Sequence, residues 1–144
     1  MKKIQALKLT LALLAAGMSM LAPVKLVHAQ QYYTRYIYAN SVCRYPIRMM
    51  VYHKDSENNY HPHGWYNFRP YEESRLKAHN VVLRQVVGYD LYFYAETDNR
   101  YNVPAMSWAR GDAAVNFEGI YYNLTRANLF VNTKGELEFK LSCA

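Results

Sequence analysis

The chain has 144 residues and a formal net charge of +6, from 17 basic and 11 acidic side chains. This length fits a single globular domain. Four of the lysines lie within the first 25 residues, so the rest of the chain carries 13 basic and 11 acidic side chains, or +2. So small a charge argues against a nucleic-acid partner.

The first 29 residues have the three parts of a cleavable secretory signal peptide. Lysines open the segment, residues 9–21 form an uncharged apolar run, and Val27-His28-Ala29 provides compact residues for a signal peptidase. The run is shorter than the roughly 20 residues that a membrane-spanning helix needs, and Pro23 follows it. We therefore expect cleavage before Gln30, a periplasmic or secreted product, and no integral membrane protein after cleavage. Residues 30–144 are then predicted to be one domain.

The mature chain contains two cysteines, Cys43 and Cys143. A pair of cysteines in an oxidising compartment predicts a disulfide, here closing a loop of about 100 residues. A redox or metal role is the alternative, but neither cysteine belongs to a Cys-x-x-Cys pair.

Alternation of apolar and polar residues recurs along the mature chain and predicts β-strands. The clearest example is at the C-terminal end, where Leu137, Phe139 and Leu141 alternate with polar residues and Cys143 keeps the same phase. The disulfide should therefore cap the core. The strand candidates are residues 32–39, 45–54, 60–69, 72–78, 89–96, 117–124, 127–131 and 136–143.

Three connecting segments complete the pattern. Residues 81–87 fit either a helical face or a strand, residues 98–111 read as a long loop, and Asn132 to Gly135 form a hairpin turn. Several short strands without a clear helix predict an all-β fold. We expect an antiparallel β-sandwich of six to eight strands, either immunoglobulin-like or similar to a small barrel.

Part of the chain combines an early cysteine (Cys43), a Gly-Trp strand (Gly64-Trp65), a proline turn (Pro70) and a Tyr-x-Tyr-Ala strand (Tyr92 to Ala95). In these features it resembles a family of small exported bacterial proteins that is known only as a domain of unknown function. The resemblance covers residues 36–98. The family's turn usually continues with Gly and a second Cys, whereas here Tyr71 and Glu72 follow Pro70. The resemblance implies no catalytic residue.

Histidines provide the most suggestive chemistry. His61 and His63 are two residues apart, so an extended strand places both imidazoles on one face, where they could bind Zn²⁺ or Cu²⁺. His53, or an acid such as Glu57, could supply a third ligand across a hairpin. The alternative is a solvated bend at Pro62, because proline interrupts the strand ladder and no carboxylate lies within the motif.

Aromatic residues are the second candidate, since all 15 tyrosines lie after the signal segment. Tyr92 and Tyr94 share a strand face with Asp90 and Glu96, so they should point outward and could form an interface. Cross-strand pairing that merely stabilises the sheet explains them equally well. Trp65 should share the face of His61 and His63, as a core residue or as part of a binding platform.

Catalytic motifs are absent from the sequence. There is no Gly-x-Ser-x-Gly, no Ser-x-x-Lys and no cysteine left free by the predicted disulfide. We therefore expect an exported, non-enzymatic binding module without a cofactor, whose partner is a protein or an envelope glycan. A metal-binding protein or metal-dependent enzyme is one alternative. An inhibitor of an envelope enzyme, acting through the loop at residues 99–111, is another.

Overall fold

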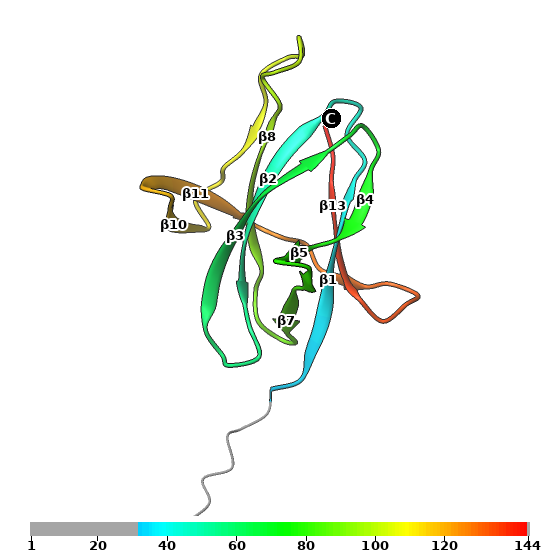
Figure 1. Ribbon diagram of the computed structural model, residues 1–144, viewed down its shortest axis with the longest axis vertical. Coiled ribbons are helices and arrows are strands. Elements are labelled where there is room, and N and C mark those ends of the chain that lie inside the picture. The colour runs from blue at the N-terminus through cyan, green and yellow to red at the C-terminus, as the bar shows by residue number, and fades with distance from the viewer. Residues whose placement is uncertain (1–31, 144) are drawn as a thin grey trace, which may run out of the picture. The chain divides into compact units, whose positions relative to one another are not determined.

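The computed structural model describes residues 32–143 (Figure 1). The predicted signal peptide and the cleavage site before Gln30 lie outside these residues. The described part of the chain contains strands and no helix, so the prediction of an all-β fold is confirmed.

The first sheet is built around β1 (Thr34–Ser41), which pairs with three shorter strands, each of which covers only part of its length. Its strand order is β12 (Phe130–Val131), β13 (Leu137–Leu141), β1 and β4 (Glu73–Arg75), and β7 (Arg84–Val86) pairs with the first half of β1. Figure 1 shows β1 and β13 side by side. The first and last strands of the described residues are thus neighbours.

The second sheet contains the candidate site. Its order is β10 (Ala113–Phe117), β11 (Ile120–Arg126), β8 (Tyr92–Thr97), β2 (Ile47–Lys54) and β3 (Tyr60–Phe68), with β9 (Ser107–Trp108) paired to β8. The central strands β2 and β8 share six consecutive paired residues, from Ile47 opposite Thr97 to Tyr52 opposite Tyr92. A separate two-stranded ribbon joins β5 (Lys77–Ala78) and β6 (Val81–Val82).

The hydrophobic core lies between the two sheets, as alternation requires. Inward residues of β1 and β13 meet those of β2 and β8, and the rings of Phe93 and Phe139 stack 5.3 Å apart. Met49 and Ile37 are completely buried in the same cluster. Each sheet therefore buries its apolar face against the apolar face of the other.

Two features differ from the expected antiparallel sandwich of six to eight strands. Residues 32–143 contain 13 strands, because residues 72–78 and 81–87 each form two short strands and because β9 and β10 were not expected. In addition, β1 and β13 are parallel, with Ile37 opposite Leu137 and Ser41 opposite Leu141. Alternation is the same in parallel and antiparallel strands, so the sequence pattern could not distinguish them.

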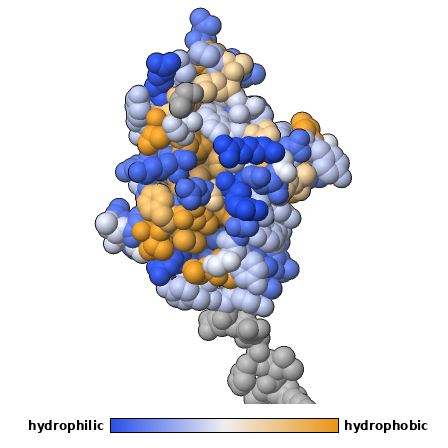
Figure 2. All heavy atoms as spheres, turned by 180° about the vertical axis from the view of Figure 1, so that it is seen from behind, coloured by the Kyte–Doolittle hydropathy of each residue, from blue (hydrophilic) through white to orange (hydrophobic). Residues whose placement is uncertain are grey.

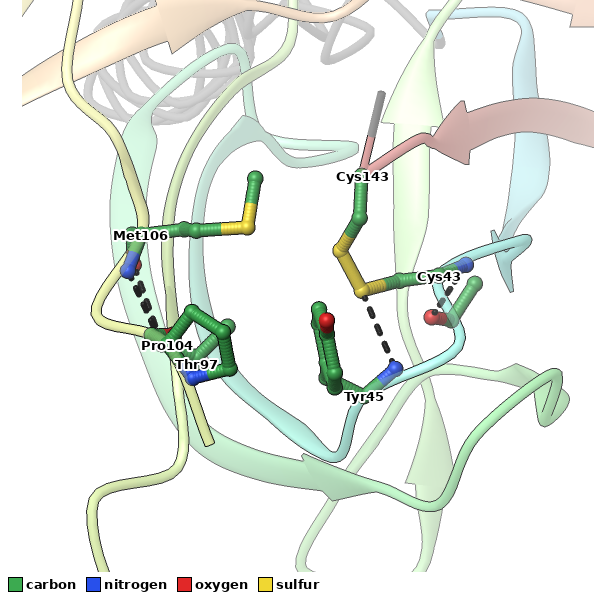
Figure 3. Close-up of a disulfide and its surroundings, with 7 residues drawn as sticks. Cys43, Tyr45, Thr97, Pro104, Met106 and Cys143 are labelled. Atoms are coloured by element: carbon green, nitrogen blue, oxygen red, sulfur yellow. Dashed lines mark hydrogen bonds between the residues drawn. A yellow bond between two sulfur atoms is a disulfide. The ribbon is translucent and has the colours of Figure 1, made fainter. Parts of the chain in front are cut away.

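The predicted disulfide between Cys43 and Cys143 is present (Figure 3). Cys43 is completely buried, and Cys143 packs against the core as its phase on β13 predicts. The backbone N–H of Tyr45 donates to Sγ of Cys43 at 3.4 Å. The disulfide therefore closes one end of the β1–β13 pair.

Candidate functional site

One face of the second sheet carries a continuous set of aromatic side chains, which we call the aromatic face. Strand alternation places them there, because every second residue of β2 and β8 turns away from the core. All of these side chains are half-buried. The set consists of Tyr52, Tyr60, Trp65, Tyr92, Tyr94, Phe117 and Tyr122.

Tyr92 belongs to a group of three tyrosines near the β2–β3 turn. Its ring centroid lies 6.5 Å from that of Tyr52 and 6.2 Å from that of Tyr60. The hydroxyl of Tyr60 donates to the carbonyl of Asp90 at 2.8 Å. The ammonium group of Lys54 lies 5.4 Å from the centre of the Tyr60 ring. This group therefore connects β2, β3 and β8, and the charged Lys54 lies at its border.

Trp65 is the centre of a second group. Its ring contacts those of Tyr94, Phe117 and Tyr122 edge-on, at centroid distances of 6.0, 6.1 and 5.4 Å. The guanidinium of Arg48 lies over the indole, 4.3 Å from its centre. Trp65 is therefore supported on several sides while remaining partly exposed.

The prediction that Trp65 shares a face with His61 and His63 is wrong. Met49 pairs with Tyr66 and Val51 with His63, so β3 has one residue more than β2 between these pairs. This bulge reverses the alternation of β3 and moves Trp65 to the opposite face of the sheet. The structure brings Trp65 together with Tyr94 instead.

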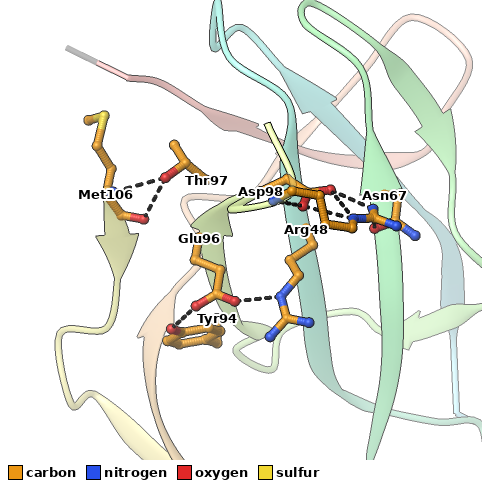
Figure 4. Close-up of polar contacts among 8 residues, drawn as sticks. Arg48, Asn67, Tyr94, Glu96, Thr97, Asp98 and Met106 are labelled. Atoms are coloured by element: carbon orange, nitrogen blue, oxygen red, sulfur yellow. Dashed lines mark hydrogen bonds and ion pairs between the residues drawn. The ribbon is translucent and has the colours of Figure 1, made fainter. Parts of the chain in front are cut away.

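Charged side chains interact with one another and with Tyr94 on the aromatic face (Figure 4). Arg48 forms an ion pair with Glu96, and the hydroxyl of Tyr94 donates to Oε2 of Glu96 at 2.7 Å. Burial raises the pKa of Tyr94, and Glu96 raises it further. The phenol therefore stays protonated at neutral pH and acts as a hydrogen-bond donor.

The tip of the β10–β11 hairpin extends the aromatic face with exposed apolar side chains. Tyr121 is 79% exposed and Ile120 is 57% exposed, whereas Phe117 and Tyr122 in the same hairpin pack on Trp65. Viewed from behind, the hairpin forms a projecting lobe with an apolar group at its edge (Figure 2). Sequence reasoning missed this hairpin, although Gly119 was its available signal.

The histidines of the predicted metal site lie on the other face of β2 and β3. His53 pairs with His61, and the rings of His53 and His63 are 5.0 Å apart. His61 instead makes an ion-pair contact with Asp55, from Nε2 to Oδ2 at 2.7 Å. His53 is buried, and its Nδ1 lies 2.8 Å from the carbonyl of Arg84.

These histidines are close without forming a ligand set. Among residues 32–143, no group of three or more His, Cys, Asp or Glu side chains is placed to hold a metal ion. Burial lowers the pKa of His53 to about 4, so this ring is neutral at neutral pH. The cluster therefore has one buried neutral imidazole and one that faces a carboxylate.

The loop considered for an inhibitor lies beyond the end of β8, where Figure 1 shows it projecting from the sheet. Its Tyr101 is 56% exposed. The loop is not free of structure, because Ser107 and Trp108 form β9, paired with Glu96 and Ala95. Thr97 also accepts a hydrogen bond from the backbone N–H of Met106 at 3.0 Å.

Comparison with other proteins identifies no relative. The chain matches no protein-family model, no curated protein and no solved structure. The resemblance to a family of small exported bacterial proteins stays a prediction.

Within residues 32–143 no helix is long and apolar enough to cross a membrane.

Proposed function

We propose that this protein is an exported, non-enzymatic binding module that holds a protein partner on the aromatic face and the β10–β11 hairpin tip. The observation that carries the proposal is the exposure of Tyr121 and Ile120 on a hairpin that is packed against Trp65. Exposed large apolar side chains on a rigid support are a typical feature of protein interfaces.

The composition of the surface supports a protein partner. Trp, Tyr and Arg are the residues most enriched among those that dominate binding energy, and Trp65, Tyr94 and Arg48 meet in one cluster. Their contacts already restrict the side chains, so binding loses little conformational entropy. Arg48 with Glu96, and Arg126 with Asp90, provide a charged rim.

The spacing of the rings favours a broad contact over a small ligand. Neighbouring centroids are 4.9 to 6.5 Å apart, so the rings contact one another and form a broad surface. A protein surface can cover such an area, whereas a small molecule gains most from being enclosed.

Export is supported by the disulfide. A buried bond between Cys43 and Cys143 fits an oxidising compartment, such as the periplasm or the extracellular medium. We therefore place the partner among the proteins of the bacterial envelope.

Capture from a periplasmic extract tests the proposal. Wild-type protein, the double variant Ile120→Ser/Tyr121→Ser and a control variant Tyr33→Ser would be immobilised, and the captured proteins quantified by mass spectrometry. Tyr33 directly precedes β1, is 65% exposed and does not belong to the aromatic face. We expect wild type and control to capture the same partner, and the double variant to lose about tenfold or more in affinity for it.

A second variant separates binding from folding. Tyr92→Ser should weaken capture with only a modest loss of thermal stability, because Tyr92 lies at the border of the aromatic face and contacts only Tyr52 and Tyr60 among its rings. Tyr94→Ser should lower stability as well, because Tyr94 contacts Trp65 and Glu96. Equal capture by wild type and the Ile120→Ser/Tyr121→Ser variant would show that the hairpin tip is not an interface.

A further inference from the structure

A cavity lies beyond the ends of β3 and β8, away from the hairpin tip; we call it the end pocket. It has a volume of about 670 Å³, within the range of small-ligand sites. The turn after β3 and the loop after β8 form its two walls. The residues that line it include Pro46, Asn67, Phe68, Arg69, Glu72 and Tyr101.

Backbone hydrogen bonds hold both walls in place. The N–H of Tyr71 donates to the carbonyl of Cys43 at 3.1 Å, and the N–H of Asp98 donates to the carbonyl of Pro46 at 2.9 Å. Both walls are thereby attached to the segment that begins at the disulfide. The cavity is therefore formed before any ligand arrives, which lowers the entropic cost of binding.

A buried carboxylate fixes an arginine in the wall. Asp98 is 2% exposed and accepts hydrogen bonds from Nε of Arg100 at 2.9 and 3.1 Å. The guanidinium of Arg100 also donates to Oδ1 of Asn67 at 3.1 Å. Oδ1 of Asn67 is engaged in this way, and its amide N–H groups donate to no acceptor among residues 32–143, so they are available to a ligand.

The charges around the end pocket balance. Arg69 and Arg100 are matched by Glu72 and Asp98, and Oε2 of Glu72 accepts the backbone N–H of Arg69 at 2.6 Å. A charged ligand would meet a like charge as well as an opposite one. A neutral ligand whose groups both donate and accept would satisfy both kinds of wall residue.

The apolar part of the lining adds a second condition. Phe68 is buried beneath the cavity, Pro46 and Pro70 lie beside it, and the ring of Tyr101 is 56% exposed. Hydroxyl groups along a ring with apolar C–H faces meet both conditions, and a sugar combines them. We propose that the end pocket binds a neutral saccharide, which stacks on Tyr101 and is hydrogen-bonded by Asn67, Arg69 and Glu72.

Titration of labelled protein with defined sugars tests this proposal. The amide NMR spectrum would be followed during addition of maltose, cellobiose and di-N-acetylchitobiose, up to about 20 mM, which detects even millimolar affinity. Glucuronic acid would be the charged comparison. We expect at least one neutral sugar to shift the amides of residues 67–72 and 98–101.

Variants of the wall give the decisive comparison. Tyr101→Ala should weaken sugar binding about tenfold through loss of ring stacking, and Glu72→Gln should weaken it through loss of an acceptor. Tyr71→Ala is the matched control, since Tyr71 is 67% exposed beside the cavity and does not line it. We expect that variant to bind as wild type does.

Two results would overturn the proposal. One is the absence of shifts for all three neutral sugars, or shifts with glucuronic acid alone. The other is equal affinity in wild type and Tyr101→Ala. Because none of these substitutions touches the hairpin tip, this outcome is independent of the protein-binding experiment.

Discussion

Burial decides how each histidine responds to pH. His53 is 3% exposed and its Nε2 has no hydrogen-bond partner among residues 32–143. Burial also lowers the pKa of His63, and the nearby His61 and His79 lower it further. Asp55, the carboxylate that favours a charged His53 or His63, already contacts His61. The cluster is therefore stable when its buried members are neutral.

The first prediction is a loss of stability in acid that depends on His53. Its pKa falls from 6.5 to about 4 on folding, so the unfolded chain binds the proton more tightly. Stability is then complete above pH 6.5 and declines by about 3 kcal/mol as the pH falls towards 4. Urea unfolding at several pH values would measure this slope.

His53→Asn provides the comparison for that experiment. An amide can keep a hydrogen bond to the carbonyl of Arg84 without titrating. Most of the slope between pH 6.5 and 4 should disappear, while His61→Asn should retain it. The lowered carboxyl pKa values of Asp98 and Asp55 affect stability only below about 4, outside this window. An unchanged slope in His53→Asn would show that another group is responsible.

A second residue-scale prediction concerns the close approach of β3 to β2 at Gly64. A Cβ at this position would lie 2.8 Å from Cβ of Met50 and 3.3 Å from the carbonyl oxygen of Met49. Gly64→Ala should lower the free energy of unfolding by about 1 to 3 kcal/mol, as other overpacking changes do. It should also alter the near-ultraviolet circular dichroism of Trp65.

Gly111→Ala distinguishes this contact from a backbone effect. Gly111 has a φ of +78° and no neighbour within 4 Å of an added Cβ, so only its left-handed conformation disfavours alanine. Its variant should leave the aromatic signal unchanged. A Gly64→Ala protein as stable as wild type would mean that β2 and β3 can separate without penalty.

At the scale of elements, the sequence predicts strands far better than their local irregularities. Alternation correctly predicts β2, β8 and β13 to within a few residues. It fails at the β3 bulge, because one additional residue reverses the faces without changing the composition. The predicted outward positions of Tyr92 and Tyr94 depended on β8 alone, which has no bulge. The error for Trp65 arose because that prediction depended on β3.

The β10–β11 hairpin was not predicted, for a different reason. Phe117 pairs with Ile120, and Glu118 and Gly119 between them have positive φ values of 54° and 83°. Asn-Gly or Asp-Gly usually marks such a turn, whereas glutamate rarely adopts this conformation. The sequence therefore indicated one strand across residues 117–124 where the structure has a turn.

Side chains, more than backbone pairing, should hold this hairpin to the sheet. Only Thr125 and Arg126 of β11 pair with β8, whereas Phe117 and Tyr122 both contact Trp65. Phe117→Ala should therefore accelerate hydrogen exchange and proteolysis across residues 113–124, with a smaller effect on global unfolding.

Tyr121→Ala is the control, because that ring is 79% exposed and has no such contact. It should leave exchange unchanged. If Phe117→Ala leaves the amides of residues 113–124 fully protected, the aromatic contacts are not what positions the hairpin.

At the scale of the whole molecule, the first and last strands of residues 32–143 pair with each other. β1 and β13 pair in parallel at a constant separation of 100 residues, from Ile37 with Leu137 to Ser41 with Leu141. Cys43 and Cys143 continue the same register. The sequence shows the two cysteines and the two alternating strands. Only the structure shows that the disulfide lies at the end of this pair and not across an antiparallel one.

This arrangement makes the disulfide important for the whole fold. Pairing two strands that are 100 residues apart requires closing most of the chain into a loop, and a parallel pair is slightly less stable per residue than an antiparallel one. The disulfide keeps this loop closed in the unfolded state as well and so lowers the conformational entropy of the unfolded chain. Reduction should therefore lower the free energy of unfolding by about 4 to 5 kcal/mol. Urea unfolding of oxidised and reduced protein would measure the difference.

Hydrogen exchange shows which strands lose stability when the disulfide is reduced. Cys43 is completely buried, so the reduced protein retains the packing of both side chains, and the comparison avoids the cavity that Cys43→Ala would leave. Exchange should increase first in residues 137–141, whose pairing with β1 no longer has a covalent end. β2 and β8 should remain protected, because their six-residue pairing does not depend on the chain termini. If reduced and oxidised protein have equal stability and equal exchange in β13, the β1–β13 pair closes the fold without the disulfide.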